Sequence, residues 1–285
     1  MKKQLLLTLS ILLGGSILSS CGGNSSTTIK ICASELPHAK ILNEAIKPLI
    51  EEKGYTLEVR VLDWTIQNSS VAAKDYDANY FQHIPYLDTY NSEVSEEYQL
   101  EAACKVHYEK LCLYASNKNE KTIKNNSRII LVDDPSNAER ALKLLEENNI
   151  LTINDSNYVD GAFKNFNIEN PNSCVTFLEG YENISLTCIP ESNLCVSLPD
   201  YDFGIIPGNT MLTGYSDLNE RIVFGEDASE DLISEKANII AVRKNDINSE
   251  KTLVLVEAFK DTRVETYIST TFGESVLYHY EDLTK

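Results

Sequence analysis

Aromatic and imidazole side chains lie close together in residues 75–88, which have the sequence DYDANYFQHIPYLD. A strand pattern runs into a loop and then into a helical pattern there, as at the edge of a cleft. Phe81, His83 and Tyr86 would form a partly apolar wall with polar tips, which suits a small ligand with a soft, uncharged side chain. The alternative is that these side chains only pack the core and an interface, and composition alone favours that alternative.

A second segment, residues 131–142 (LVDDPSNAERAL), places a guanidinium group just beyond the end of a predicted strand. Ser136 and Glu139 have the spacing of a capping box, which predicts that a helix begins here. Arg140 then lies in the first turns of that helix, where a guanidinium can hold a carboxylate and free backbone amides add positive potential. The segment therefore predicts an anchor for an amino-acid carboxylate, although a solvated surface arginine fits the same pattern.

Common catalytic and nucleotide-binding motifs are absent from the sequence: it has no G-x-G-x-x-G, Walker A, G-x-S-x-G or H-E-x-x-H. We therefore predict a protein that is not an enzyme and has no cofactor. A metal site would have to be assembled by folding from at least three histidines, or from two with carboxylates, because His38, His83, His107 and His279 are scattered. We expect no metal site, and a metal-binding protein is kept as an alternative.

The N-terminus has the pattern of an export signal. It begins Met1-Lys2-Lys3, continues with a mostly apolar run and ends in Leu18-Ser19-Ser20-Cys21. That ending resembles the bacterial lipobox, in which a diacylglycerol is attached to the cysteine before cleavage. We predict a lipoprotein signal peptide over residues 1–20, a lipidated Cys21 and a flexible tether over residues 21–28. The acyl chains would then be the membrane attachment, on the extracytoplasmic face of the cell membrane.

The chain is strongly acidic, with 43 acidic against 25 basic residues and a net charge of −18. No cluster of lysine or arginine interrupts this field, so nucleic acid is not an expected partner. The cysteines after Cys21 either form disulfides in the exported protein, for example between Cys188 and Cys195, or are small buried residues. These cysteines are Cys32, Cys104, Cys112, Cys174, Cys188 and Cys195.

Short apolar strands alternate with helical patterns along the chain, which predicts α/β architecture with largely parallel sheets. The chain starts as a βαβ unit, with a strand over residues 29–33, a helix over 38–53 and a strand over 57–62. Further helices are expected over residues 137–148 and 249–259 and near the C-terminus. Further strands are expected over residues 78–81, 103–108, 111–115, 128–132, 175–178, 203–206 and 238–242.

The length of 285 residues predicts two lobes, yet no linker rich in Pro, Gly or Ser divides the chain in the middle. We therefore expect a discontinuous division, in which the chain leaves the first lobe, builds the second and returns. A cleft would form between the two. The predicted ranges are 29–106 and 209–285 for the first lobe and 107–208 for the second.

The motifs in their order along the chain resemble a known family, the NlpA family, which contains the methionine-binding lipoproteins of bacterial ABC importers. The lipobox agrees with this resemblance, which covers almost the whole chain. The segments that carry it are Pro37-His38-Ala39, residues 77–88 (DANYFQHIPYLD), residues 134–142, Glu169-Asn170-Pro171 and residues 238–243 (NIIAVR).

The resemblance implies a two-lobed, periplasmic-binding-protein-like α/β fold of type II with the ligand cleft between the lobes. Such a protein closes on one amino acid and delivers it to a transmembrane permease, which a cytoplasmic ATPase drives. The resemblance also implies that Phe81, His83 and Tyr86 surround a thioether side chain. It assigns the ligand's carboxylate to Arg140 and a contact with the ligand's backbone end to Asn170.

Departures from the family pattern bear on the ligand. Pro207 stands where the family commonly has an asparagine, which removes an amide that accepts from an ammonium and donates to a carboxylate. Asn209 is a candidate substitute, and Trp64 replaces a tyrosine with a bulkier ring. The segment between Pro171 and Pro207 is also longer than the family spacing. The predicted ligand-binding residues are Trp64, Phe81, His83, Tyr86, Arg140, Asn170 and Asn209.

Because of these departures, the sequence is compatible with more than one related ligand. Methionine is the first candidate, and a methionine-containing dipeptide or another amino acid in the same fold is the second, because a longer ligand would place its ammonium elsewhere. A third interpretation is a surface lipoprotein used for adhesion, in which the acidic field and the exposed aromatic residues matter and the cleft is vestigial.

Overall fold

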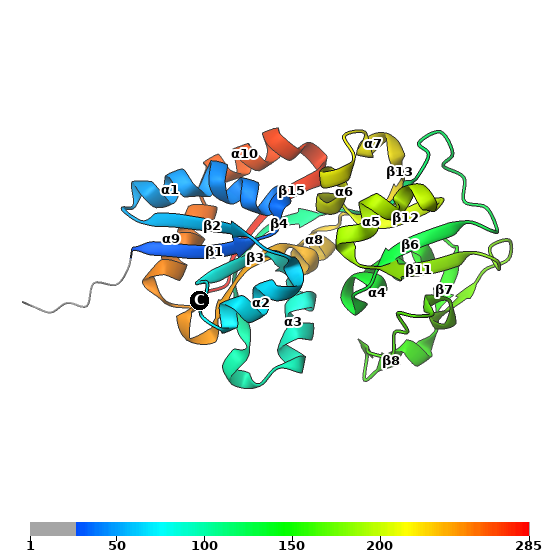
Figure 1. Cartoon of the computed structure of the whole chain (residues 1–285), viewed down its shortest axis with the longest axis horizontal. Coiled ribbons are helices and arrows are strands. Elements are labelled where there is room, and N and C mark those ends of the chain that lie inside the picture. Colours follow the sequence, from blue (N-terminus) through cyan, green and yellow to red (C-terminus); the bar gives the residue numbers. More distant parts are fainter. Residues whose placement is uncertain (1–26, 285) are drawn as a thin grey trace, which may run out of the picture.

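The structure is a computed structural model that describes residues 27–284, and in it two α/β lobes lie side by side (Figure 1). The predicted α/β class and the two lobes are thereby confirmed. The predicted signal peptide, Cys21 and all but the end of the tether lie outside the described residues. Within residues 27–284, no helix combines the length and the apolarity needed to cross a membrane.

The first lobe is built on a six-stranded sheet in the order β15-β4-β14-β3-β1-β2. The strand β1 pairs in parallel with both of its neighbours, whereas β14 and β15 run antiparallel to theirs. All six residues of β3 are buried because helices cover both faces of this sheet. The strands are β1 (Thr28–Ala33), β2 (Thr56–Val61), β3 (Ala78–His83), β4 (Leu100–Glu109), β14 (Asn238–Arg243) and β15 (Val276–Asp282).

Helices pack their apolar faces against both sides of the first sheet. On one side lie α1 (Lys47–Glu52), α9 (Glu250–Phe259) and α10 (Thr262–Phe272), where Phe259 is fully buried against the strands. On the other side lie α2 (Trp64–Ala72) and α3 (Ile84–Glu93), which contribute Val71 and Leu87 to a smaller core. The helix predicted over residues 38–53 consists of two wider helical turns, Glu35–Ala39 and Leu42–Ile46, followed by α1.

The second lobe is built on a five-stranded sheet in the order β11-β6-β12-β5-β13. Its two faces are covered by α4 on one side and by α5 and α6 on the other. The strands are β5 (Leu111–Ala115), β6 (Arg128–Val132), β11 (Ser185–Ile189), β12 (Phe203–Pro207) and β13 (Ile222–Gly225). The helices are α4 (Pro135–Glu147), α5 (Glu191–Ser197), α6 (Gly208–Gly214) and α7 (Leu218–Arg221).

Two small strand pairs complete this lobe, and one helix follows it. The pairs are β7 (Leu151–Ile153) with β10 (Val175–Phe177) and β8 (Tyr158–Val159) with β9 (Ala162–Phe163). The helix α8 (Glu230–Lys236) joins β13 of the second sheet to β14 of the first.

The expectation of largely parallel sheets was wrong. In the first sheet β14 lies between β3 and β4 and runs antiparallel to both. In the second sheet β5 runs antiparallel to β12 and β13. Strands buried on both faces read as continuous apolar runs, and such runs do not reveal the direction of pairing.

The strand pairing also differs from the predicted lobe ranges at both junctions. The strand β4 stays paired with β14 and β15 up to Glu109, three residues past the predicted end of the first segment. The strand β13 pairs with β5 of the second sheet, although it lies beyond residue 208. Because β13 is a short edge strand of four residues, its sequence carried too little pattern to be recognised.

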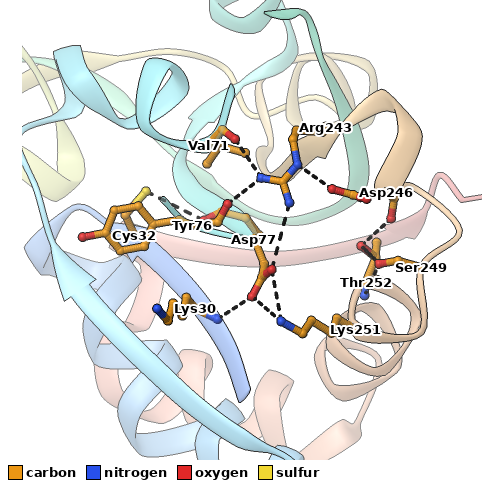
Figure 2. Close-up of polar contacts among 11 residues, drawn as sticks. Lys30, Cys32, Val71, Tyr76, Asp77, Arg243, Asp246, Ser249, Lys251 and Thr252 are labelled. Atoms are coloured by element: carbon orange, nitrogen blue, oxygen red, sulfur yellow. Dashed lines mark hydrogen bonds and ion pairs between the residues drawn. The ribbon is translucent and has the colours of Figure 1, made fainter. Parts of the chain in front are cut away.

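The strand β3, which carries Phe81 and His83, is held at its start by hydrogen bonds and ion pairs of Asp77 (Figure 2). One carboxylate oxygen of Asp77 accepts from the backbone N–H of Lys30 in β1 at 2.8 Å and from Nζ of Lys251 in α9 at 3.0 Å. Arg243 at the end of β14 lies 4.0 Å from the same carboxylate and is held in turn by Asp246. Figure 2 shows these groups converging from β1, β14 and α9, so Asp77 fixes the start of β3.

Candidate ligand-binding site

A cavity of about 470 Å³, part of it open to solvent, lies between the two lobes. Both lobes line it, so a ligand bound there would contact both. The first lobe contributes Ser34, Trp64, Phe81, Gln82, His83, Tyr86, Glu109 and Asn238, and the second contributes Asn137, Arg140, Glu191, Pro207 and Asn209.

Three aromatic rings form one side of the cavity, and we call Trp64, Phe81 and Tyr86 the aromatic wall. The ring centroids of Trp64 and Tyr86 are 5.3 Å apart, those of Phe81 and Tyr86 are 5.6 Å apart, and both pairs meet edge to face. Asp63 caps α2 by accepting from the N–H of Thr65 at 3.0 Å, which places Trp64 at the start of that helix. Such rings offer an apolar, polarizable surface to a ligand.

His83 joins the two lobes at the edge of this wall. Its Nδ1 accepts from the backbone N–H of Tyr86 at 3.2 Å, so the imidazole caps α3. Its Nε2 lies 3.1 Å from Oδ1 of Asn137 across the cleft, which fits a neutral ring that donates from Nε2. Burial, and then the positive charges of Arg140 and Lys236, lower the pKa of His83 to about 3.

We therefore expect His83 to stay neutral down to pH 5. In the unfolded chain the same imidazole titrates near pH 6.5, so its contribution opposes folding increasingly as the pH falls below that value. The measurement is a ¹⁵N NMR titration of the imidazole, assigned by comparison with His83→Gln. A resonance that titrates near pH 6.5 in the folded protein would contradict the neutral, Nε2-donating form.

The helix that carries Arg140 is capped two residues before the start of the predicted capping box. Asp134, not Ser136, caps α4, since its carboxylate accepts from the N–H of Asn137 at 2.9 Å and Pro135 occupies the first turn. The hydroxyl of Ser136 is buried without a hydrogen-bond partner among the described residues. The predicted helix exists, but its capping residue was wrong because an earlier Asp-Pro pair provides a better start.

Arg140 is buried, and its charge is balanced inside the protein. Its Nε and Nη2 donate to the two carboxylate oxygens of Glu226, at 2.5 Å for Nη2, and Nη2 also donates to the carbonyl of Glu109 at 2.8 Å. Both charged side chains are only 6% exposed, so the alternative of a solvated surface arginine is wrong. Arg140 also lines the cavity, so its guanidinium group can contact a ligand there.

Glu226 also forms hydrogen bonds that connect the two chain segments that cross between the lobes. Its Oε2 accepts from the hydroxyl of Tyr108 at 2.7 Å and from the N–H of Leu111 at 3.0 Å. Its own N–H donates to the carbonyl of Leu111 at 3.1 Å. We call these two crossing segments the hinge. Glu226, which neutralises Arg140, therefore also forms the hydrogen bonds that connect the two hinge segments.

Two further carboxylates, Glu109 and Glu191, line the cavity. Burial raises the pKa of each to about 7. Glu109 accepts from Nε2 of His107 at 2.7 Å. Glu191 accepts from the hydroxyl of Thr210 at 2.5 Å.

Among the described residues, His38, His107 and Glu109 form the one group with the spacing of a metal site, with ligand atoms within 4.8 Å of one another. Hydrogen bonds already occupy these atoms. Nε2 of His107 bonds to Glu109, and Nε2 of His38 lies 3.0 Å from Oδ1 of Asn238. Burial lowers the pKa of His38 to about 4 and that of His107 to about 3, so both rings are neutral. The arrangement is that of a hydrogen-bonded polar network below the cavity floor.

Six of the seven predicted ligand-binding residues line the cavity, namely Trp64, Phe81, His83, Tyr86, Arg140 and Asn209. The prediction for Asn170 needs correction. Asn170 is exposed on the second lobe, where it precedes the helical turn Pro171–Cys174, and it does not line the cavity. Asn170 had been matched directly before the segment of unusual length between Pro171 and Pro207, where the alignment to the family pattern is least secure.

Other lining residues were not predicted. Asn137 and Asn238 lie inside motifs that were recognised, so their place in those motifs is the signal that was overlooked. Glu109 and Glu191 had no such signal, because an isolated glutamate resembles any surface acid. The suggested disulfide is also absent: all six described cysteines are free, with Cys188 and Cys195 packed in cores on opposite faces of the second sheet.

Known proteins resemble this chain in both sequence and fold. A model of the NlpA lipoprotein family matches residues 29–279. The methionine-binding lipoprotein MetQ of Bacillus subtilis is 30% identical over 96% of this chain and 98% of its own length. The crystal structure of a putative methionine-binding lipoprotein from Bacillus subtilis has a TM-score of 0.76 at 29% identity, covering 90% of this chain and 99% of that one.

A methionine-bound structure shares the fold. A nutrient binding protein from Burkholderia cenocepacia, solved bound to methionine, has a TM-score of 0.77 at 23% identity and covers 88% of this chain and 99% of its own.

Proposed function

The chain belongs to the NlpA lipoprotein family, and we propose that it is the lipid-anchored solute-binding component of a bacterial ABC importer. It captures methionine or a close amino-acid analogue in the cavity between its lobes and delivers it to a permease. The observation that carries the proposal is the combination, in one cavity, of the aromatic wall with a buried arginine and several amides. The ligand is bound and released without chemical change.

The aromatic wall suits the side chain of methionine. A thioether is polarizable and gains from contact with ring edges and faces, by about 0.3–1.5 kcal/mol for each favourable contact. Trp64, Phe81 and Tyr86 offer such surfaces from three different elements, α2, β3 and α3. An unbranched side chain fits between them more easily than a branched one.

The polar groups opposite the wall suit the backbone end of an amino acid. Arg140 supplies a guanidinium group for a carboxylate, and Asn209 and Asn238 supply amide donors from α6 and β14. Because these groups come from both lobes, ligand binding favours the closed arrangement, which is the form that a permease would recognise.

The sequence supports an attachment to the membrane, because the Leu18-Ser19-Ser20-Cys21 ending fits a lipobox, whose cleavage would make Cys21 the mature N-terminus. We propose that the lipid at Cys21 holds the protein on the extracytoplasmic face, with the ATPase on the other side of the membrane. The tether before β1 would let the lobes reach the permease.

The first experiment identifies the ligand. We expect mass spectrometry of the small molecules released by denaturing residues 24–285, purified without added amino acids, to find methionine. Calorimetric titration of the emptied protein should then show tight binding of methionine and several-fold weaker binding of norleucine, which has the same shape without the sulfur.

Other outcomes of this experiment have clear meanings. Release of a methionine-containing dipeptide, or of another amino acid, would keep the importer function and change the ligand. Protein that is empty and ignores added methionine and methionine dipeptides would overturn the proposal and favour the adhesion alternative.

A further inference from the structure

The charges that line the cavity are unbalanced. Among the described lining residues Arg140 is the only lysine or arginine, and Glu226 already neutralises it. Glu109 and Glu191 add two carboxylates, and the neighbouring imidazoles of His38, His83 and His107 are held neutral by burial. Burial raises the pKa of both acids to about 7, so at neutral pH they are only partly ionised. A ligand group with a positive charge would stabilise their ionised form and would be stabilised by it.

The amide oxygens of the cavity are largely engaged with other parts of the protein. Oδ1 of Asn137 faces Nε2 of His83 at 3.1 Å, and Oδ1 of Asn238 faces Nε2 of His38 at 3.0 Å. Oε1 of Gln82 accepts from Asn68 at 2.9 Å. Pro207, which also lines the cavity, has neither an N–H nor a polar side chain. The remaining amide oxygen, Oδ1 of Asn209, lies 3.3 Å from the Thr210 hydroxyl that also donates to Glu191. The acceptors left for an ammonium group are therefore on the side of the cavity where Glu191 and Asn209 lie.

Of the two carboxylates Glu109 and Glu191, Glu191 makes fewer hydrogen bonds and ion pairs with other described residues. It opens α5, and the described residues supply its side chain with one donor, the hydroxyl of Thr210. The groups that act on it electrostatically are Asp134, Glu109 and Asp63, all of them acidic. Glu109, by contrast, is held by His107 at 2.7 Å and lies 3.5 Å from His38.

We infer that Glu191 accepts a hydrogen bond from the α-ammonium group of the bound amino acid, in the cavity that Pro207 also lines without a polar side chain. This inference rests on the proposed function. It deepens that function by assigning the ligand's two charged ends to different elements, the carboxylate to Arg140 on α4 and the ammonium to Glu191 on α5. The ligand class is then an amino acid, or a peptide with a free N-terminus, rather than a simple carboxylic acid.

The test changes one residue of the protein and one group of the ligand and compares the four resulting affinities. Methionine and 4-(methylthio)butanoate, its analogue without the ammonium, are titrated into the wild-type protein and into Glu191→Gln. Glutamine keeps an oxygen for the Thr210 hydroxyl and removes only the charge. We expect Glu191→Gln to bind methionine about 10- to 100-fold more weakly and the analogue as well as the wild type does, or better.

Glu93→Gln is the matched control. Glu93 is an exposed residue at the end of α3 that lies near Tyr86 without lining the cavity. The control should leave both affinities unchanged, and unfolding midpoints of all three proteins check that each is folded.

Each outcome decides between the two claims. An equal loss of affinity for both ligands in Glu191→Gln, or no loss for either, would overturn the role of Glu191. The proposal that the wild-type protein binds methionine would still stand. If the wild-type protein binds neither ligand, methionine is not its ligand and the proposal made for methionine fails together with this inference.

Discussion

Replacing Glu226 by glutamine is expected to lower the free energy of unfolding by about 3–5 kcal/mol. The substitution leaves the guanidinium of Arg140 buried without its counter-charge, since both side chains are only 6% exposed. It also weakens the hydrogen bonds from Tyr108 and Leu111 that hold the two crossing segments of the hinge. The measurement is equilibrium unfolding in urea, followed by tryptophan fluorescence and by circular dichroism.

The matched control is Glu52→Gln. Glu52 pairs with Arg263 through two hydrogen bonds of 2.8 and 3.0 Å, the same fork geometry, but both side chains are 57% exposed. Because water solvates both partners, this variant should be as stable as the wild type within experimental error. Equal stability of Glu226→Gln and Glu52→Gln would contradict a buried, internally balanced pair.

A double variant separates stability from binding. Arg140→Met with Glu226→Leu replaces the buried pair by apolar groups of similar size, which in other proteins is neutral or stabilising. We expect it to recover most of the stability that Glu226→Gln loses and still to bind methionine poorly, because the carboxylate of the ligand has no guanidinium to contact. Recovery of binding together with stability would show that Arg140 acts only through the fold.

The sequence indicated the site where its residues lie close together in the chain. Phe81, His83 and Tyr86 fall within six residues on β3 and α3, so a local pattern could place all three. Arg140 was placed by the strand and helix that surround it. Its partner Glu226 lies 86 residues further along, and a single sequence carries no signal for such a pairing.

Failures of the prediction have similar physical causes. Four residues of β13 are too few to show a strand pattern, so the return of the chain to the first lobe was placed too early. Asn170 was assigned by a motif that directly precedes the segment of unusual length, and it lies on the surface. Glu191 has the position of an ordinary acidic residue in the first turn of a helix, and only the folded cavity distinguishes it.

The position of Glu226 also bears on closure of the cleft. The same carboxylate contacts the crossing segment at Leu111, the hydroxyl of Tyr108 and the guanidinium that faces the cavity. A ligand carboxylate that binds Arg140 would therefore contact a group that is hydrogen-bonded through Glu226 to both crossing segments. Binding and the relative orientation of the lobes are thus physically linked through one ion pair.

Truncating Tyr86 to alanine should weaken methionine binding by about 2–4 kcal/mol, which corresponds to roughly 30- to 1,000-fold. Tyr86 is the central ring of the aromatic wall, in contact with both Trp64 and Phe81, so its loss removes one contact surface and loosens the other two. The measurement is calorimetric titration with methionine, with an unfolding midpoint to confirm that the variant is folded.

Two comparisons show which part of Tyr86 matters. Tyr86→Phe keeps the ring and should bind methionine nearly as well as the wild type, because the thioether contacts the ring rather than the hydroxyl. Tyr98→Ala removes a tyrosine that is 49% exposed and lies outside the cavity, so it should leave the affinity unchanged. A folded Tyr86→Ala protein with wild-type affinity would place the side chain of the ligand away from the wall. An equal loss in Tyr86→Phe would instead assign the interaction to the hydroxyl, which favours a ligand with a polar side chain over methionine.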